Sequence, residues 1–148
     1  MPGDRRRPSK PDSCQEQWLS GFRLERLDPD RFEACVGHAD FGGGVAVSCM
    51  RFGGAVEIEM QPLLATYLVV LPARGEVRMV CGGSDALATP ERAVIVDPGD
   101  AHWQVWAADT EALLVQVAAS RVCAAGEAGA AARLPIELDV TTEPGRGW

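Results

Sequence analysis

The chain has 148 residues, of which 47% are hydrophobic and 24% charged, a composition typical of a globular protein rather than of a disordered one. Fourteen basic and 21 acidic residues give a formal net charge of −7, which argues against a chain that grips a nucleic-acid backbone. No apolar run is long enough for a membrane helix, and no apolar segment follows the basic triplet at 5–7 as it would in a secretion signal. The sequence therefore predicts one cytoplasmic domain without a membrane partner.

The N-terminal region divides into two parts. Residues 1–13 are rich in Pro, Arg and Ser and lack a hydrophobic period, so we expect a disordered tail. Between Cys14 and Leu27, Trp18 and Phe22 follow helical spacing, which predicts a short helix that passes into a strand.

The middle of the chain reads as a series of short strands. Val56–Met60 alternates strictly between apolar and acidic residues, as expected of a strand with one wet face. Leu64–Leu71 is apolar on both faces, so it should be buried on both sides or line a cavity. A Gly-Gly hairpin turn is expected at 82–83, and another turn at 97–100. The expected strands cover residues 32–39, 45–52, 56–60, 64–71, 75–81, 87–89, 93–96, 103–106 and 113–117.

About nine short strands with regular turns indicate an all-β sandwich or barrel, and the lack of strand–helix alternation disfavours an α/β nucleotide-binding fold. After Ala118 the chain becomes rich in Ala and Gly. We expect a weak helix over Ala119–Arg133 and an extended piece over Leu134–Leu138. The predicted organisation is a tail at 1–13, a barrel at 14–118, and a C-terminal helix and linker segment at 119–148.

Few residues in the chain suggest catalysis. The five cysteines are widely spaced and form no C-x-x-C motif, so they are interpreted as free thiols rather than as a zinc or disulfide site. The only histidines are His38 and His102, and pairing His102 with Cys49 or Cys81 matches no nucleophile motif. No phosphate-binding loop occurs, because no predicted helix follows the glycines at 42–44.

The segment AVIVDPGDAHWQVW at 93–106 carries a Gly turn followed three residues later by a histidine, here Gly99 and His102. This resembles the second motif of cupin barrels. The segments RFGGAVEIEMQPLLATYLVVLPARGEVRMVCGG at 51–83 and LPIELDVTTEPGRGW at 134–148 extend the likeness. Together they resemble the N-terminal ligand-binding domain of AraC-type transcription regulators, over roughly residues 31–148.

The resemblance implies an all-β, cupin-like double-stranded β-helix barrel with short flanking helices. It implies an effector-sensing domain of a bacterial transcription regulator that binds a small molecule and contributes to dimerisation. The helix-turn-helix units that bind DNA in this family follow the barrel and are absent from this chain, so we expect no direct DNA binding by it. Since the segment 119–133 is short and small-sided, we expect a monomer or a weak homodimer.

The chain departs from metal-binding cupins at their ligand positions. Those proteins carry His-x-His and a Glu ahead of the glycine that matches Gly75, whereas Met60–Leu68 contains no histidine and Leu68 stands about where the glutamate would be. We therefore expect no metal, no cofactor, no catalytic residues and no enzyme activity. Two alternatives remain: a small stand-alone cupin enzyme or binding protein, and an effector-free interaction module whose barrel is filled by its own side chains.

Strand alternation places His102, Gln104 and Trp106 on one face, which the cupin resemblance turns toward the barrel interior. With Tyr67 and Arg74, these residues are the predicted ligand-binding site. Three of them have a plainer interpretation: His102 as a turn histidine bonded to nearby backbone, Trp106 as core packing, and Arg74 as a solvated side chain.

Overall fold

The computed structural model describes residues 22–27, 34–125 and 134–142, and most of them lie in strands and tight turns. The elements are β1 (Phe22–Leu27), β2 (Ala34–Asp40), β3 (Val45–Phe52), β4 (Val56–Met60), β5 (Thr66–Arg74), β6 (Val77–Cys81), β7 (Ser84–Ala88), β8 (Arg92–Val96), β9 (His102–Trp106), β10 (Glu111–Ala118), α2 (Ala119–Ala125) and β11 (Glu137–Asp139). The tail at 1–13, the helix expected before residue 22 and the C-terminal parts at 126–133 and 143–148 lie outside the described residues. Within the described ranges, no helix has the length and apolar character needed to cross a membrane.

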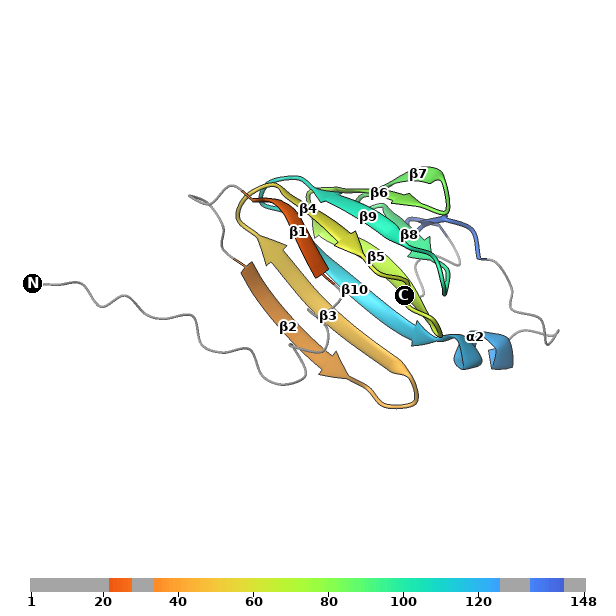
Figure 1. Cartoon of the computed structure of the whole chain (residues 1–148). Helices are drawn as coiled ribbons and strands as arrows, with labels where there is room; N and C mark the ends of the chain where they lie inside the picture. Colours follow the sequence, from red (N-terminus) through yellow and green to blue (C-terminus); the bar gives the residue numbers. More distant parts are fainter. Residues whose placement is uncertain (1–21, 28–33, 126–133, 143–148) are drawn as a thin grey trace, which may run out of the picture.

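The strands form two antiparallel sheets (Figure 1). One sheet has the order β1-β4-β9-β6-β7, and the other has the order β11-β8-β5-β10-β3-β2. The strand series expected from the sequence is therefore confirmed, with shifts of only a few residues at most strand ends.

The smaller sheet shows how the alternating sequence builds the interior. In β4, β6 and β9, every second residue is buried, and the residues between them are half-buried or exposed. The buried set packs against residues of β3, β5 and β10 in the larger sheet, including Met50, Leu68 and Leu114, and forms one continuous core. This core closes the space between the two sheets.

Strand β5 lies between β8 and β10 in the larger sheet and is buried on both faces. Leu68 and Val70 face the core between the sheets. Tyr67 and Val69 face the other way, into a second cluster that includes Val122 of α2 and residues of the 134–140 segment. The doubly apolar stretch is thus explained by burial on both sides of the sheet.

Both predicted turns form as expected. Gly82 and Gly83 have φ values of 56° and 78°, and the flanking residues Cys81 and Ser84 pair directly, which defines a two-residue hairpin. In the other turn, the Asp100 amide donates to the Asp97 carbonyl at 3.3 Å, with Gly99 at a φ of 84°.

Candidate functional site

The predicted face of β9 points into the core. His102, Gln104 and Trp106 are 4%, 0% and 0% exposed. Strand β9 runs between β4 and β6, so these side chains sit in the middle of the smaller sheet. The shared face predicted by alternation, and its inward orientation implied by the cupin resemblance, are confirmed.

These three side chains form a hydrogen-bonded chain. The Trp106 indole Nε1 donates to Oε1 of Gln104 at 2.8 Å, and Nε2 of Gln104 lies 2.9 Å from Nε2 of His102. An indole nitrogen can only donate, so Gln104 must present its oxygen to Trp106 and its NH₂ group to His102. Nε2 of His102 is therefore an acceptor, and the proton of the neutral ring is on Nδ1.

Burial keeps His102 neutral. Desolvation is the main cause that lowers the pKa of His102 below its ordinary value, and the nearby backbone and negative charge of Asp100 only partly oppose this shift. Nδ1 is buried, and among the described residues no group accepts a hydrogen bond from it in good geometry. This N–H is thus a buried donor at one end of the polar chain.

The arrangement around His102 does not fit the metal centre of metal-binding cupins. Its Nε2 is engaged by Gln104, and its cross-strand neighbours are Met60 and Cys81. Within the described ranges, no three His, Cys, Asp or Glu side chains are grouped to hold a metal ion.

Trp106 is a packing residue as well as a hydrogen-bond donor. Its ring meets that of Phe52 edge-on, with centroids 5.1 Å apart and planes at 88°. Both residues belong to the buried core. The indole therefore fixes the two sheets to each other at the end of β9.

Two predicted site residues do not join this group. Tyr67 faces the cluster on the outer side of the larger sheet, because alternation along β5 separates it from inward-facing Leu68. Arg74 is exposed at the end of β5, where its Nε donates to the Asp109 carbonyl at 3.3 Å. The expectation that Tyr67 shares a cavity wall with the β9 residues is wrong, and Arg74 lies at the surface rather than beside them.

The sequence reasoning missed a set of polar residues on the inner face of the larger sheet. Gln116 pairs with Leu68 on β5 and with Ala46 on β3, so it shares their inward face. Two residues further along β10, on the same face, Ala118 pairs with Thr66. Alternation along β10, in which Ala112 and Leu114 point inward, would have placed Gln116 there too.

These residues line a pocket of about 290 Å³, here called the glycine-turn pocket. Its lining residues are Asp40, Gly42, Gly43, Gly44, Val45, Ala46, Thr66, Gln116 and Ala118. The turn beside it is held by the side chain of Asp40, which accepts from the Gly42 amide at 2.8 Å, and by Arg121, whose Nε donates to the Gly43 carbonyl at 2.5 Å.

The glycine-turn pocket and His102 lie at the same end of the barrel. Met60 pairs with His102, and the chain then needs only a short loop to reach Thr66 at the pocket. The amide of Gly99, in the turn before His102, donates to the Leu63 carbonyl in that loop at 2.8 Å. Next to the pocket on the inner face, Oγ of Ser48 and Nδ1 of His38 are 2.9 Å apart.

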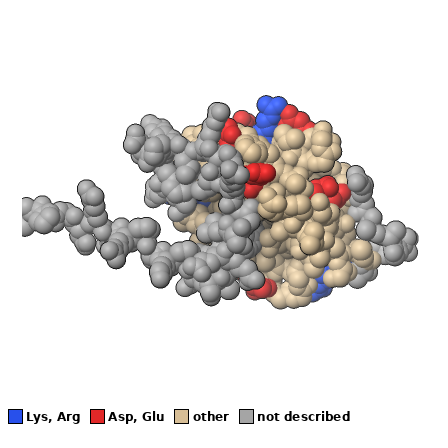
Figure 2. All heavy atoms as spheres, in the orientation of Figure 1, with Lys and Arg blue, Asp and Glu red and all other residues tan. Residues whose placement is uncertain are grey.

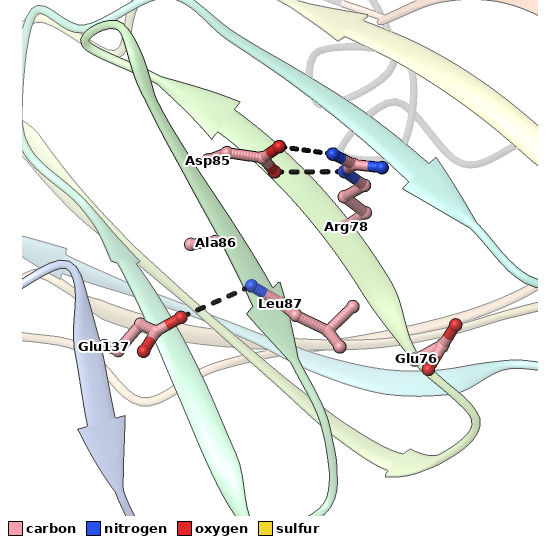
Figure 3. Close-up of a pocket in the computed structure, with 6 residues that line it drawn as sticks. All are labelled: Glu76, Arg78, Asp85, Ala86, Leu87 and Glu137. Carbon is pink, nitrogen blue, oxygen red and sulfur yellow. Dashed lines mark hydrogen bonds and ion pairs between the residues drawn. The ribbon is translucent and has the colours of Figure 1, made fainter.

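A larger groove of about 450 Å³ lies outside the barrel, along edge strand β7 (Figure 3). Except for Glu76, its polar side chains are paired with protein groups. Arg78 binds both carboxylate oxygens of Asp85, and Oε1 of Glu137 accepts from the Leu87 amide at 3.5 Å. The groove therefore has fewer free polar groups to offer a ligand than the glycine-turn pocket.

Comparisons with known proteins agree with this architecture. The family model of the AraC-binding-like domain matches residues 16–148. The crystal structure of the AraC-like transcriptional activator CuxR superposes with a TM-score of 0.58 at 11% identity, covering 75% of this chain and 45% of that one. KdgF from Halomonas sp. gives 0.51 at 10% identity, covering 65% of this chain and 86% of that one. The cupin domain of Schizosaccharomyces pombe Cnp3 gives 0.50 at 8% identity, covering 70% and 73%.

These structural likenesses confirm the cupin-like fold. No curated protein matches the sequence. The chain corresponds to 45% of the length of CuxR, so it spans less than half of that regulator.

Proposed function

This chain belongs to the AraC-binding-like domain family, and we propose that it is the effector-sensing domain of an AraC-type transcription regulator. Its cupin-like barrel is built like the corresponding part of an AraC-like activator. In this proposal the barrel binds a small molecule, and DNA is bound by a separate domain. A cytoplasmic location follows from the same role.

We place the effector in the glycine-turn pocket. The observation that carries this assignment is the inward-facing polar set there, with the Gln116 amide, the Thr66 hydroxyl and the Asp40 carboxylate around a volume of about 290 Å³. A small pocket with a few convergent polar groups is the usual form of a ligand site. These groups favour an effector that carries hydroxyl or amide groups.

The β9 residues have a supporting role in this proposal. Gln104 and Trp106 are fully buried and hydrogen-bonded to each other, so they stabilise the core rather than contact the ligand. His102 ends this polar chain at the same end of the barrel as the pocket, and its Nδ1 is buried near the backbone of Asp100 rather than open to a ligand.

We also propose that the domain is not an enzyme. The one buried imidazole in the described core is neutral, and its Nε2 accepts from Gln104. The rival proposal, a stand-alone cupin enzyme, requires a metal at stoichiometric occupancy in purified protein, which elemental analysis would reveal.

The effector assignment is tested by thermal-shift screening of the full chain against small sugars, polyols and carboxamides, followed by calorimetry on any binder. Gln116→Leu and Thr66→Val should each weaken binding by roughly tenfold, as expected for loss of one ligand hydrogen bond. Thr89→Val is the matched control, because Thr89 lies at the opposite end of the barrel beside Ala88, whose partner Val77 pairs with Trp106. A binder whose affinity is unchanged in both pocket variants would contradict this placement.

For the assembly state, we propose a monomer or a weak dimer. Helix α2 is described over only seven residues, with small side chains at most positions. Sedimentation velocity should show monomer at micromolar concentration, whereas a dimer that persists at nanomolar concentration would contradict the proposal.

A further inference from the structure

Two glutamines on the inner faces of the sheets differ in what they bind. The amide of Gln104 is used at both ends, by Trp106 and by His102. Gln116 is half-buried on β10 and lines the glycine-turn pocket. Within the part of the chain that the structure describes, no group forms a hydrogen bond with the Gln116 side chain. Its carbonyl oxygen and its NH₂ group are therefore both available to a molecule in the pocket.

The space beside the Gln116 amide exists because the neighbouring side chains are short. Its cross-strand partner on β3 is Ala46, and Ala118 follows two residues later on the same face of β10. Gly44 packs so closely on Ala118 that an added Cβ would lie 2.6 Å from the Ala118 methyl group. By contrast, Leu114, two residues before Gln116, is fully buried in the core. The core is filled up to Leu114, and the pocket begins at Gln116.

A carboxylate lies across the pocket from this amide. Asp40 pairs with Ala46, and Ala46 pairs with Gln116, so the three residues form one row across β2, β3 and β10. Two strand spacings place the backbones of Asp40 and Gln116 about 10 Å apart, with the Ala46 methyl group between them. Oδ1 of Asp40 accepts from the Gly42 amide at 2.8 Å. The ion pairs between described residues leave Asp40 out, so its second oxygen is a further acceptor at the pocket.

We propose that the glycine-turn pocket recognises a primary carboxamide. This inference rests on the proposed function, because it names the chemical class of the effector at that site. The ligand carbonyl accepts from the NH₂ group of Gln116, and the ligand N–H on the same edge donates to the Gln116 carbonyl. The second ligand N–H is directed toward the Asp40 carboxylate, and the rest of the ligand lies over Ala46.

Other small polar groups match this row less well. Two planar amides pair through two parallel hydrogen bonds, whereas a single hydroxyl group cannot meet both atoms of the Gln116 amide in that geometry. A carboxylate has no proton to donate to the Gln116 carbonyl, and the negative charge of Asp40 repels it.

The test is an NMR titration of the full ¹⁵N-labelled chain with benzamide. The side-chain NH₂ signals of Gln116 and the backbone amides of Gly43 and Gly44 should shift and saturate. Acetophenone has nearly the same shape but carries a methyl group in place of the NH₂ group. It should bind at least roughly tenfold more weakly than benzamide, because both ligand donors are lost. Benzoate should also bind more weakly than benzamide.

Variants test which residue makes this distinction. Gln116→Met keeps the length of the side chain but removes its amide, so benzamide should bind roughly tenfold or more weakly, while the affinity for acetophenone should hardly change. Gln61→Met is the matched control, because it makes the same change at an exposed position outside the pocket lining. Ala46→Val narrows the pocket without removing a hydrogen bond and should weaken both ligands.

The possible failures separate this inference from the proposed function. Equal affinities for benzamide and acetophenone, or an unchanged benzamide affinity in Gln116→Met, would overturn the carboxamide assignment. Glycerol that binds and is lost in Gln116→Met, in a chain that does not bind benzamide, would overturn the carboxamide class but support the pocket as the effector site. Shifts confined to residues outside the pocket, for every ligand tried, would overturn both.

Discussion

At the scale of single residues, Gln104 holds the buried polar atoms of the core together. It accepts from Trp106 and donates to His102, so two neighbouring side chains depend on it. All three are almost completely removed from water, where an unpaired polar atom is most costly. The core therefore tolerates polar residues on β9 only because they satisfy one another.

Replacing this amide should destabilise the fold. Gln104→Leu keeps a similar volume but leaves the Trp106 N–H without an acceptor and His102 Nε2 without a donor. We expect the free energy of unfolding to fall by roughly 2–6 kcal/mol, at about 1–3 kcal/mol for each of the two orphaned groups. Urea denaturation measures this change. The control is Gln61→Leu at an exposed loop position, which should change stability by less than about 0.5 kcal/mol.

His102 should make the fold sensitive to mild acid. Burial lowers the pKa of His102 below its ordinary 6.5, so below that pH the unfolded chain takes up a proton that the folded chain resists. The contribution of His102 to the free energy of unfolding should therefore be constant above about pH 6.5. Below that pH it should decrease until the pH reaches the pKa of His102 in the folded state. The limiting slope is about 1.4 kcal/mol per pH unit for one proton.

Urea denaturation at pH 7.5, 6.5 and 5.5 tests this dependence. In His102→Gln the acid-dependent loss over this range should disappear. Hydrogen bonds with Arg78 and Thr141 lower the pKa values of Asp85 and Asp139. The contribution of these two carboxylates to stability is therefore lost only at pH values below the ordinary 3.8. A native chain with the same stability at all three pH values would contradict the assignment of a neutral, buried His102.

At the scale of elements, the connection from β5 to β6 is the tightest link between the sheets. Strand β5 belongs to the larger sheet and β6 to the smaller one, so the chain must cross at Gly75 and Glu76. Thr110 is fully buried there, and its Oγ1 exchanges hydrogen bonds with the Glu76 backbone at 3.2 and 3.3 Å. This packing leaves no room for a side chain at the crossing.

Gly75→Ala should be much more harmful than an alanine at another glycine turn. Gly75 has a φ of 78°, and an added Cβ would lie 2.9 Å from Cα of Thr110. Gly83 has the same φ of 78° but nothing within 4 Å. Gly83→Ala therefore isolates the backbone strain, about 1–2 kcal/mol, and Gly75→Ala should add a clash of about 1–3 kcal/mol. Thermal and urea denaturation of both variants measure the difference in stability. Equal losses of stability in the two variants would contradict the expected clash with Thr110.

At the scale of the whole molecule, the charge distribution argues against DNA binding by this chain. On the face shown in Figure 2, the basic side chains are few and separated, and acidic ones lie between them. Two of the described arginines, Arg78 and Arg92, are paired with carboxylates. A phosphate backbone would meet a net charge of −7 over the chain.

The chain alone should not bind duplex DNA. Fluorescence anisotropy with a labelled duplex at 150 mM salt should show no binding up to about 100 μM protein, the weak end of non-specific affinities. The basic cluster at 5–7 is the one sequence feature that could give a low-salt signal. Affinity that survives at this salt after removal of residues 1–13 would contradict the prediction.

The sequence by itself determined the strands, their turns and the shared face of His102, Gln104 and Trp106, because alternation and turn residues are local features. The inward direction of that face came from the cupin resemblance. Val56–Met60 and the Gly82-Gly83 turn needed no information from distant segments. By contrast, Tyr67 and Leu68 are adjacent apolar residues on a strand buried on both sides, so alternation cannot tell which of them faces the core. The orientation of Tyr67 and Leu68 is determined by the register of β5 with β8 and β10 and by the packing of α2 on one side of the sheet. Alternation along β10 is enough to place Gln116 on the inward face, but the glycine-turn pocket itself could not be predicted, since Gln116, Thr66 and Asp40 come from three strands that only the folded sheets bring together.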